Sequence, residues 1–441
     1  MRRDRATWLT LAIFLCGCAV LWLTEVTSTG HLVDNLVAGY LFSWGLYALL
    51  SNLPRKEIRA RFVLVTLSVI VMLGIAELAG VVGLLNYQTL FGTHGREWFD
   101  RSGYVRDPEL GYRREPHYRE RGFFVRGNIG EALCLPANAP EPFDLRYDHR
   151  GFRNDTDMDR ADVVVIGDSY VESPMLPGSS LLTTQLSHRL QTSVANLGIS
   201  GYGPEQELVV LKRYALNLQP KTIVWVFFEG NDFYQLAPED LDDLAVRGEP
   251  DVRAAHDEYW MRSLTRNLLL VSRRAVRGCV PHSGYLRLRG TFRDTEGKET
   301  VLYFWERLAA LKLTDRPRLD RLRSILAEAY ELTRQRGIRL VVAFAPVKHR
   351  VHQGLHNFEP LTDEMRDWPL NDLPNEVATM LGELTPEIVF LDLTPPLREA
   401  AAQGRLTYLP DDTHWTVEGQ RVAGEAIHHV LAGSQTRLAK Q

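Results

Sequence analysis

The feature that most constrains this chain is the uneven distribution of its apolar residues, which gather at the N-terminal end. Residues 8–23, 36–50 and 62–85 form three stretches that hold no charged side chain apart from Glu77. A helix of about twenty apolar residues is long enough to cross the hydrocarbon of a bilayer. The sequence therefore predicts three transmembrane helices and a membrane anchor over residues 1–86.

Basic residues predict the orientation of these spans. Lys and Arg occur within residues 1–7 and 51–61, whereas residues 24–35 contain neither. Segments rich in Lys and Arg stay on the cytoplasmic side of a membrane. We therefore expect a cytoplasmic N-terminus, and three spans then place the chain after residue 85 in a periplasmic or extracellular compartment.

Two features of the anchor leave alternatives open. Cys16 and Cys18 lie in a Leu-Cys-Gly-Cys run that could mark a lipidated signal peptide, but the apolar run continues beyond it, which favours a span. Glu77 is either a proton or ion carrier or a carboxyl buried against Tyr40 or Ser43 of a neighbouring helix. We favour the second interpretation because no other charge accompanies Glu77 in its stretch.

Charge and cysteine content exclude two classes of protein. The 441 residues contain 51 Lys and Arg against 55 Asp and Glu, so the basic excess needed for nucleic-acid binding is missing. Four cysteines cannot form a disulfide scaffold for a chain of this length, and no Cys and His residues show the spacing of a zinc site. We predict no metal, no cofactor and no nucleic-acid partner. Cys134 and Cys279 can form a disulfide in an exported domain, or remain two free thiols.

After residue 161 the sequence alternates short β-branched runs with amphipathic stretches. This alternation is typical of an α/β domain with a mainly parallel sheet between two layers of helices. Apolar runs such as Val163-Val164-Val165-Ile166 suit strands that are buried on both faces. The predicted strands are residues 162–166, 193–197, 222–228, 339–344 and 388–393, and the predicted helices are residues 181–190, 205–216, 319–334, 375–381 and 417–431.

Two segments lack this alternation. Residues 87–160 are rich in Arg, Tyr, Gly and Pro and predict a linker with a β-rich extension. An insertion at about 233–305 interrupts the domain at 161–435. Within it, residues 261–277 predict a helix with one basic face, which either meets anionic lipid headgroups or acidic glycan, or is solvated while the apolar face packs on the domain. We favour the second interpretation.

Small and amide residues follow three of the predicted strands. Ser169 follows the first strand in a Gly-Asp-Ser triplet, Gly201 follows the second, and Asn231 follows the third. The carboxyl ends of parallel strands meet at one edge, where catalytic groups gather. If Ser169 attacks an ester carbonyl, the backbone N–H groups of Ser169 and Gly201 and the Asn231 amide can meet the oxyanion. Taken singly, each residue also suits an ordinary turn or cap.

A candidate base lies near the C-terminus, where Asp411-Asp412-Thr413-His414 precedes the last predicted helix. His414 can accept the proton of Ser169 if a carboxylate holds its other ring nitrogen. A carboxylate three residues before the histidine fits best, so we predict Asp411 as the acid. Asp412, two residues before His414, is the competitor.

Together these residues resemble the SGNH (GDSL) hydrolase family. The nucleophile, the glycine, the amide donor, the acid and the base, namely Ser169, Gly201, Asn231, Asp411 and His414, occur in the family order. The resemblance implies a flavodoxin-like three-layer α/β/α domain and covers most of residues 104–432. Glu229 departs from it, because it stands where the third block usually has glycine.

The resemblance implies a serine esterase that needs no cofactor, and the three predicted spans make it membrane-anchored and extracytoplasmic. Its expected substrate is an acyl ester, foremost an O-acetyl group, of a cell-envelope carbohydrate, and acyl transfer to a sugar hydroxyl uses the same chemistry. A lipid esterase is the next choice. A non-catalytic protein that binds envelope glycan on the same fold is the alternative from another class. Lys348 and His349, after the fourth strand, either line the pocket or cap the sheet edge.

Overall fold

The computed structural model describes residues 103–236, 288–304, 316–358 and 370–438, together with short pieces between residues 64 and 91 and between 263 and 271. The chain divides into two compact units. One is Met1–Arg96 with Asp251–Gly278, and the other is Glu97–Pro250 with Cys279–Gln441. Part of the predicted insertion therefore belongs to the same unit as the apolar N-terminal region.

Only the third apolar stretch falls partly within the described residues. Residues 71–80 are helical there, and α4 follows at Tyr87–Phe91. Among the residues with a described structure, no helix is both long enough and apolar enough to span a bilayer. Residues 8–23 and 36–50 lie outside the described part, so the three spans stay a prediction.

The side chain of Glu77 has a partner that neither interpretation of it named. Its carboxylate accepts hydrogen bonds from the backbone N–H of Thr265, at 3.0 Å, and from the Thr265 hydroxyl, at 3.1 Å. Thr265 belongs to a short helical turn over residues 264–268 within the predicted basic helix. Tyr40 and Ser43 lie outside the described residues. The predicted basic face consists of Arg262, Arg266, Arg273 and Arg277, of which only Arg266 is described, so both interpretations of the basic helix stay open.

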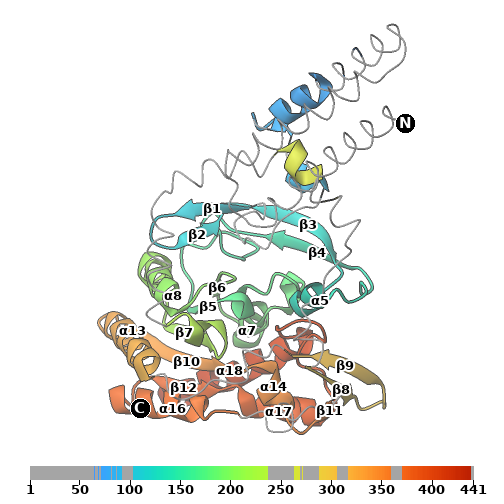
Figure 1. Ribbon diagram of the computed structural model, residues 1–441. Coiled ribbons are helices and arrows are strands. Elements are labelled where there is room, and N and C mark those ends of the chain that lie inside the picture. The colour runs from blue at the N-terminus through green and yellow to red at the C-terminus, as the bar shows by residue number, and fades with distance from the viewer. Residues whose placement is uncertain are drawn as a thin grey trace. The chain divides into compact units, whose positions relative to one another are not determined.

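A five-stranded parallel sheet forms the centre of the larger unit (Figure 1). Its strand order is β12-β10-β7-β5-β6, and all five strands were predicted to within a residue or two. The bounds are β5 Val163–Gly167, β6 Val194–Gly198, β7 Thr222–Phe228, β10 Arg339–Ala345 and β12 Val389–Asp392. Since the strands are parallel, their carboxyl ends lie at one edge of the sheet.

Helices cover both faces of this sheet, which confirms the three-layer α/β/α architecture. Alternate residues of β5 enter separate cores: Val164 and Ile166 belong to one, and Val163 and Val165 to the other. The first core includes α8 Pro204–Val210, α13 Arg316–Arg334 and α16 Leu373–Leu384. The second includes α7 Leu182–Leu190, α17 Thr394–Ala402 and α18 Val417–Leu438. The amphipathic run predicted as one helix at 205–216 continues beyond α8 as a π-helical turn, η4 Leu211–Ala215, and a 3₁₀ turn, η5 Leu216–Leu218.

Two antiparallel hairpins form the extension before β5, at the β6 end of the sheet (Figure 1). The strands are β1 Tyr104–Asp107, β2 Gly111–Arg114, β3 Arg119–Phe124 and β4 Glu141–Arg146. Helix α5, Asn128–Leu133, connects β3 to β4 and ends at Cys134, which is disulfide-bonded. Cys279 lies outside the described residues, so its pairing with Cys134 stays a prediction.

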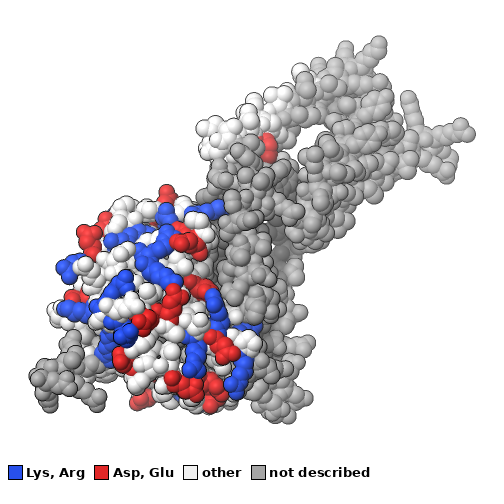
Figure 2. Space-filling model, turned by 90° about the vertical axis from the view of Figure 1, so that its left-hand side faces the viewer, with Lys and Arg blue, Asp and Glu red and all other residues white. Residues whose placement is uncertain are grey.

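A three-stranded antiparallel sheet, which the sequence did not reveal, lies partly within the insertion. It consists of β8 Arg289–Arg293 and β9 Glu299–Tyr303 with β11 His356–Phe358. On the face shown in Figure 2, Lys and Arg side chains are interspersed with Asp and Glu, in keeping with the near balance of charge in the sequence.

Glu172 joins the extension to the sheet. It lies in α6, Ser169–Glu172, and its buried carboxylate pairs with Arg114 of β2 at 2.9 Å. The hydroxyl of Tyr147 and the backbone N–H of Ser200 also donate to this carboxylate. Burial alone would raise the pKa of Glu172, but the charge of Arg114 and these donors hold it below its ordinary value. Glu172 is therefore a buried anion with a full set of partners.

We expect Arg114→Met to lower the free energy of unfolding by about 3 kcal/mol, because it leaves the Glu172 carboxylate buried without its counter-charge. The midpoint of urea unfolding, followed by tryptophan fluorescence, measures this loss. Arg121→Met is the matched control, since the Arg121 side chain is 74% exposed in its pair with Asp144. The control should leave the midpoint unchanged. Equal losses from both substitutions would contradict the role of the buried pair.

Candidate functional site

Ser169 stands at the start of α6, directly after β5. The preceding residue, Asp168, caps the helix by accepting a hydrogen bond from the backbone N–H of Tyr170 at 2.9 Å. Gly167 is required for this turn, because a Cβ there would lie 2.6 Å from the Val171 side chain and 3.0 Å from the Val226 carbonyl. The strand-to-helix turn thus fixes the hydroxyl of Ser169 at the carboxyl edge of the sheet, as the sequence predicted.

His414 reaches Ser169 from the other end of the domain. The Nε2 atom of His414 lies 2.7 Å from Oγ of Ser169. The loop that carries His414 lies before α18 and is closed by a β-bridge between Tyr408 and Trp415. In addition, the hydroxyl of Tyr170, next to the nucleophile, donates to the carbonyl of Thr413 at 2.6 Å. Two segments 245 residues apart are therefore locked together around one hydrogen bond.

The carboxylate that holds His414 is Asp412, which corrects the assignment of Asp411. Oδ1 of Asp412 contacts Nδ1 of the His414 ring and also accepts the backbone N–H of His414 at 2.9 Å. Asp411 instead turns toward the extension, where its Oδ2 accepts from Gly127 and Asn138. The sequence argument favoured the wrong residue. The side chain of Asp412 accepts a hydrogen bond from the backbone N–H two residues later, a local turn that aspartate side chains often form, and this turn brings Asp412 to the His414 ring.

Asp412 and His414 shift each other's protonation. Burial alone would raise the pKa of Asp412, but the charge of the His414 ring and three hydrogen bonds hold it at about 2. For His414, burial lowers the pKa, but the charge and the hydrogen bond of Asp412 together with the charge of Asp168 leave the pKa above the ordinary histidine value. Asp412 is thus a permanent anion at neutral pH that directs one ring nitrogen to itself and the other to Ser169.

Asp168 is a further buried carboxylate beside this pair. Burial raises its pKa to about 6, against the effect of the Tyr170 N–H and the His414 charge. Its Oδ2 is 3.5 Å from Oγ of Ser169. Asp168 lies closer to the nucleophile than the sequence motif alone indicated, where it served only as the middle residue of a triplet.

Gly201 and Asn231, the other predicted oxyanion donors, lie on adjacent segments. Gly201 has a φ of +84°, a conformation that favours glycine. The amide nitrogen of Asn231 donates to the carbonyl of Tyr202 at 3.1 Å and to Asp232 at 2.9 Å. The bond to Tyr202 connects the turn after β7 to the turn after β6. The role of both residues in stabilising an oxyanion stays a prediction.

Glu229, the departure from the family pattern, belongs to a second buried ion pair. Its carboxylate accepts from Nε of Arg350 at 2.9 Å and from the backbone N–H of Val347 at 2.9 Å. Glu229 follows β7, whereas Val347 and Arg350 follow β10. The glutamate therefore fastens two neighbouring strand ends and leaves Asn231 in its place.

Lys348 is buried and connects the loop that carries His414 to the sheet formed by β8, β9 and β11. Its Nζ donates to the carbonyls of Tyr303 in β9, at 2.9 Å, and Pro410, at 3.1 Å. The backbone N–H of Tyr303 donates to the same Pro410 carbonyl. Burial lowers the pKa of Lys348 to about 7. Its neighbour His349 is also buried, with its ring 5.7 Å from that of Phe304. Pocket lining and capping of the sheet edge were the two roles considered for Lys348. Its hydrogen bonds to Tyr303 and Pro410 correspond to neither role.

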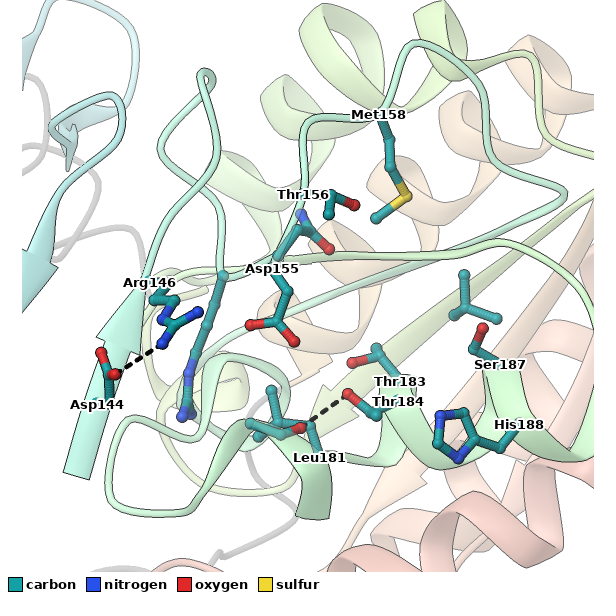
Figure 3. Close-up of a pocket in the computed structure, with 14 residues that line it drawn as sticks. Asp144, Arg146, Asp155, Thr156, Met158, Leu181, Thr183, Thr184, Ser187 and His188 are labelled. Atoms are coloured by element: carbon teal, nitrogen blue, oxygen red, sulfur yellow. Dashed lines mark hydrogen bonds and ion pairs between the residues drawn. The ribbon is translucent and has the colours of Figure 1, made fainter. Parts of the chain in front are cut away.

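A described pocket lies elsewhere, between the extension and α7 (Figure 3). Its lining includes Arg146, Asp155, Thr184 and His188, and none of Ser169, Asp412 or His414. Its polar groups are largely satisfied within the chain: Thr184 donates to the carbonyl of Gly178 at 2.8 Å, and Arg146 pairs with Asp144 at 2.9 Å. This pocket therefore does not form part of the Ser169 site.

The assignment of the acid can be tested by substitution. We expect Asp412→Asn to slow the labelling of Ser169 by a fluorophosphonate about a thousandfold or more, because the ring loses the anion that sets its tautomer. Asp411→Asn should slow it less than about tenfold, since an amide oxygen can still accept from Gly127 and Asn138. Labelling rates of the two full-length variants give the comparison, and a larger loss from Asp411→Asn would restore the original assignment.

The raised pKa of His414 predicts the pH dependence. Only the neutral ring can accept the Ser169 proton, so activity falls as the pH drops through the pKa of His414. We expect the midpoint of the acid limb to lie above about 6.5, the ordinary histidine value. In Asp412→Asn, the loss of the negative charge should move this limb to lower pH. The rate of Ser169 labelling as a function of pH measures both midpoints, and a wild-type limb below 6.5 would contradict the electrostatic assignment.

Comparison with known proteins matches the C-terminal third of the chain to one family model. Residues 295–441 match the family model described as "SGNH hydrolase-like domain, acetyltransferase AlgX". None of the curated proteins matches the sequence.

Several solved structures are similar to this chain at low sequence identity and low TM-score. A lipolytic protein of the G-D-S-L family from Desulfitobacterium hafniense is 13% identical, with 61% of this chain and 98% of that chain covered and a TM-score of 0.32. A catalytic mutant of an acetylxylan esterase from Geobacillus stearothermophilus is 12% identical, with 62% and 94% covered and a TM-score of 0.33. A GDSL-like lipase from Bacteroides thetaiotaomicron is also 12% identical, with 62% and 88% covered and a TM-score of 0.30. At such identities these structures do not define a substrate for this chain.

The family match includes Asp412 and His414 but begins after Ser169, Gly201 and Asn231. The arrangement is that of an ester hydrolase or acyltransferase. Residues 295–441 are thus similar to an SGNH hydrolase-like domain, in agreement with the resemblance of the site residues to the SGNH (GDSL) hydrolase family.

Proposed function

We propose that this protein is a membrane-anchored, extracytoplasmic serine enzyme that cleaves or transfers an acyl ester, foremost an O-acetyl group, of a cell-envelope carbohydrate. One observation carries the catalytic part of the proposal. Nε2 of His414 lies 2.7 Å from Oγ of Ser169 while Nδ1 contacts the buried carboxylate of Asp412. This is the relay of nucleophile, base and acid that acyl transfer through a serine requires.

The reaction follows from these three side chains. The Ser169 hydroxyl attacks the ester carbonyl as its proton passes to Nε2 of His414, and the imidazolium is stabilised by Asp412. Collapse of the tetrahedral intermediate breaks the ester bond, and the departing alcohol takes the proton from His414. The acyl group then resides on Ser169. Water or a second hydroxyl, deprotonated by His414, attacks this acyl-enzyme and restores the serine.

Donors to the negative oxygen of the intermediate are expected from three segments. The backbone N–H groups of Ser169 and Gly201 and the side-chain amide of Asn231 are our candidates. In the structure the Asn231 amide bonds to Tyr202 and Asp232. Binding of an oxyanion would therefore replace the bond to Tyr202 or share its hydrogen, a change that charge on the oxygen favours.

The choice of an acetyl group rests on the family match. The matching family model names an acetyltransferase, and the chemistry of Ser169 serves hydrolysis and transfer equally. Transfer requires that a carbohydrate hydroxyl reach the acyl-enzyme before water does. The two outcomes thus differ in the acceptor alone.

The proposed compartment draws on two observations. Basic residues flank the apolar stretches in the pattern of a cytoplasmic N-terminus with an exported domain after residue 85. In addition, Cys134 is disulfide-bonded, and disulfides persist in oxidising compartments such as the periplasm or the cell exterior. Both support a catalytic domain that faces away from the cytoplasm.

The test of this function uses the full chain and a small activated acetyl ester. We expect wild-type protein to release acetate, or to pass the acetyl group to an added oligosaccharide, and Ser169→Ala to lower the rate about a thousandfold or more. Mass spectrometry of the oligosaccharide separates transfer from hydrolysis. A preference for long-chain over acetyl esters would favour a lipid esterase instead.

Two further measurements complete the test. Wild-type activity equal to that of Ser169→Ala, together with binding of envelope glycan, would favour the non-catalytic alternative. A fluorophosphonate that cannot cross the cytoplasmic membrane, applied to cells whose outer layers have been made permeable, tests the compartment. It should label wild-type protein but not Ser169→Ala, and labelling only after lysis would contradict an extracytoplasmic domain.

A further inference from the structure

We propose that Asn128, at the start of α5 in the extension, is a positioning residue that sets the orientation of the Asp412 and His414 side chains. The inference rests on the proposed function, because it assigns Asn128 a part in the same reaction. Asn128 does not contact Ser169 in the described structure. It acts through the loop that carries the acid and the base, and it reaches that loop from 284 residues away in the sequence.

Asn128 forms hydrogen bonds with Asp412 and Thr413, the two residues that directly precede the base His414. Its backbone N–H donates to Oδ2 of Asp412 at 2.8 Å. Its side-chain amide donates to Oγ1 of Thr413 at 2.8 Å, while its Oδ1 accepts the backbone N–H of Thr413 at 3.0 Å. Three hydrogen bonds from one residue therefore fix Asp412 and the residue that separates it from His414.

The close approach of the two segments depends on glycines beside Asn128. A Cβ at Gly127 would lie 2.3 Å from the carbonyl oxygen of Asp411 and 2.5 Å from Cβ of Asp412. A Cβ at Gly130 would lie 2.4 Å from the Asp411 carboxylate, and the backbone N–H of Gly130 donates to the Asp411 carbonyl at 2.8 Å. The start of α5 is thus shaped to lie directly against the loop, which a merely adjacent surface segment does not require.

The two carboxylate oxygens of Asp412 contact different segments, one the base and the other the extension. Oδ1 serves the ring and the backbone of His414, and Oδ2 accepts the N–H of Asn128. A carboxylate held at both oxygens cannot rotate about its terminal bond without losing a hydrogen bond on each side. Asn128 therefore restrains the acid on the side that His414 leaves open.

Substitution of Asn128 in the full chain tests this assignment. Asn128→Ala keeps the backbone N–H that bonds Asp412 but removes both side-chain bonds to Thr413, the residue between the acid and the base. We expect it to lower kcat for the activated acetyl ester about 10- to 100-fold with KM unchanged, because the base loses its alignment with Ser169. Asn128→Asp keeps the acceptor for the Thr413 N–H but places a negative charge beside Asp412. It should recover part of the rate and move the acid limb of kcat to higher pH, since the added charge stabilises the imidazolium.

The pH shift has an identifiable origin. Among the described residues, the charged groups that act most strongly on the His414 ring are the carboxylates of Asp412 and Asp168 and the ammonium of Lys348. None of them is changed in the Asn128 variants. A displaced acid limb in Asn128→Asp therefore reports the new charge at position 128.

Asn138→Ala is the matched control. Asn138 belongs to the same extension and donates its side-chain amide to Asp411, the neighbouring carboxylate, at 3.1 Å. The N–H of Gly127 remains on that carboxylate after the substitution. We expect Asn138→Ala to lower kcat less than about threefold and to leave the acid limb in place. Equal losses from Asn128→Ala and Asn138→Ala, with no pH shift in Asn128→Asp, would overturn the assignment.

A measurement that needs no turnover separates this inference from the proposed function. The His414 ring signal, identified by its loss in His414→Gln, can be titrated by NMR in full-length protein labelled at histidine. If wild-type protein hydrolyses no ester but Asn128→Asp still raises the pKa of His414, the proposed function fails and the positioning role stands. If ester hydrolysis is present and the pKa of His414 is the same in wild-type protein and Asn128→Asp, the positioning role fails alone. Should Asn128→Ala not fold, the near-isosteric Asn128→Asp provides the decisive comparison.

Discussion

The site depends on keeping a buried carboxylate charged. Removing a carboxylate from water is costly unless hydrogen bonds and an opposite charge replace the solvent. Asp412 meets this condition through the ring and backbone of His414 and through Asn128. Because that carboxylate is held in place, it determines which ring nitrogen of His414 carries the proton. The other ring nitrogen is then free to accept the proton of the Ser169 hydroxyl.

The same physical solution recurs twice around the carboxyl edge of the sheet. Glu172 pairs with Arg114 and fastens the extension to the turn after β6, and Glu229 pairs with Arg350 and fastens the turns after β7 and β10. Irregular segments lack the repeating backbone hydrogen bonds that hold strands in place. Here, buried carboxylates that accept several hydrogen bonds hold the irregular segments in place at the carboxyl edge of the sheet.

The sequence predicted best those parts that depend on local pattern. Each strand of the central sheet is an apolar run, and Ser169 follows the first of them in a recognisable triplet. The choice between Asp411 and Asp412 could not be made in this way, because the path of the loop depends on α5, a distant segment with no periodicity. Strands β8 and β9 escaped notice for a similar reason: their polar residues show no alternation that marks a strand, and β8 also pairs with β11, over fifty residues further along the chain.

The position of α5 affects where the shortest active fragment of this protein can begin. By its sheet alone, the domain begins near residue 161, with the strand that leads to Ser169. Yet Asp411 and Asp412 are both held by residues 127–138, so a fragment cut at that boundary would keep all three reacting side chains and lose their support. The hydrolase-like fold and the machinery it carries thus have different N-terminal limits, and a truncation chosen from the fold alone would separate them.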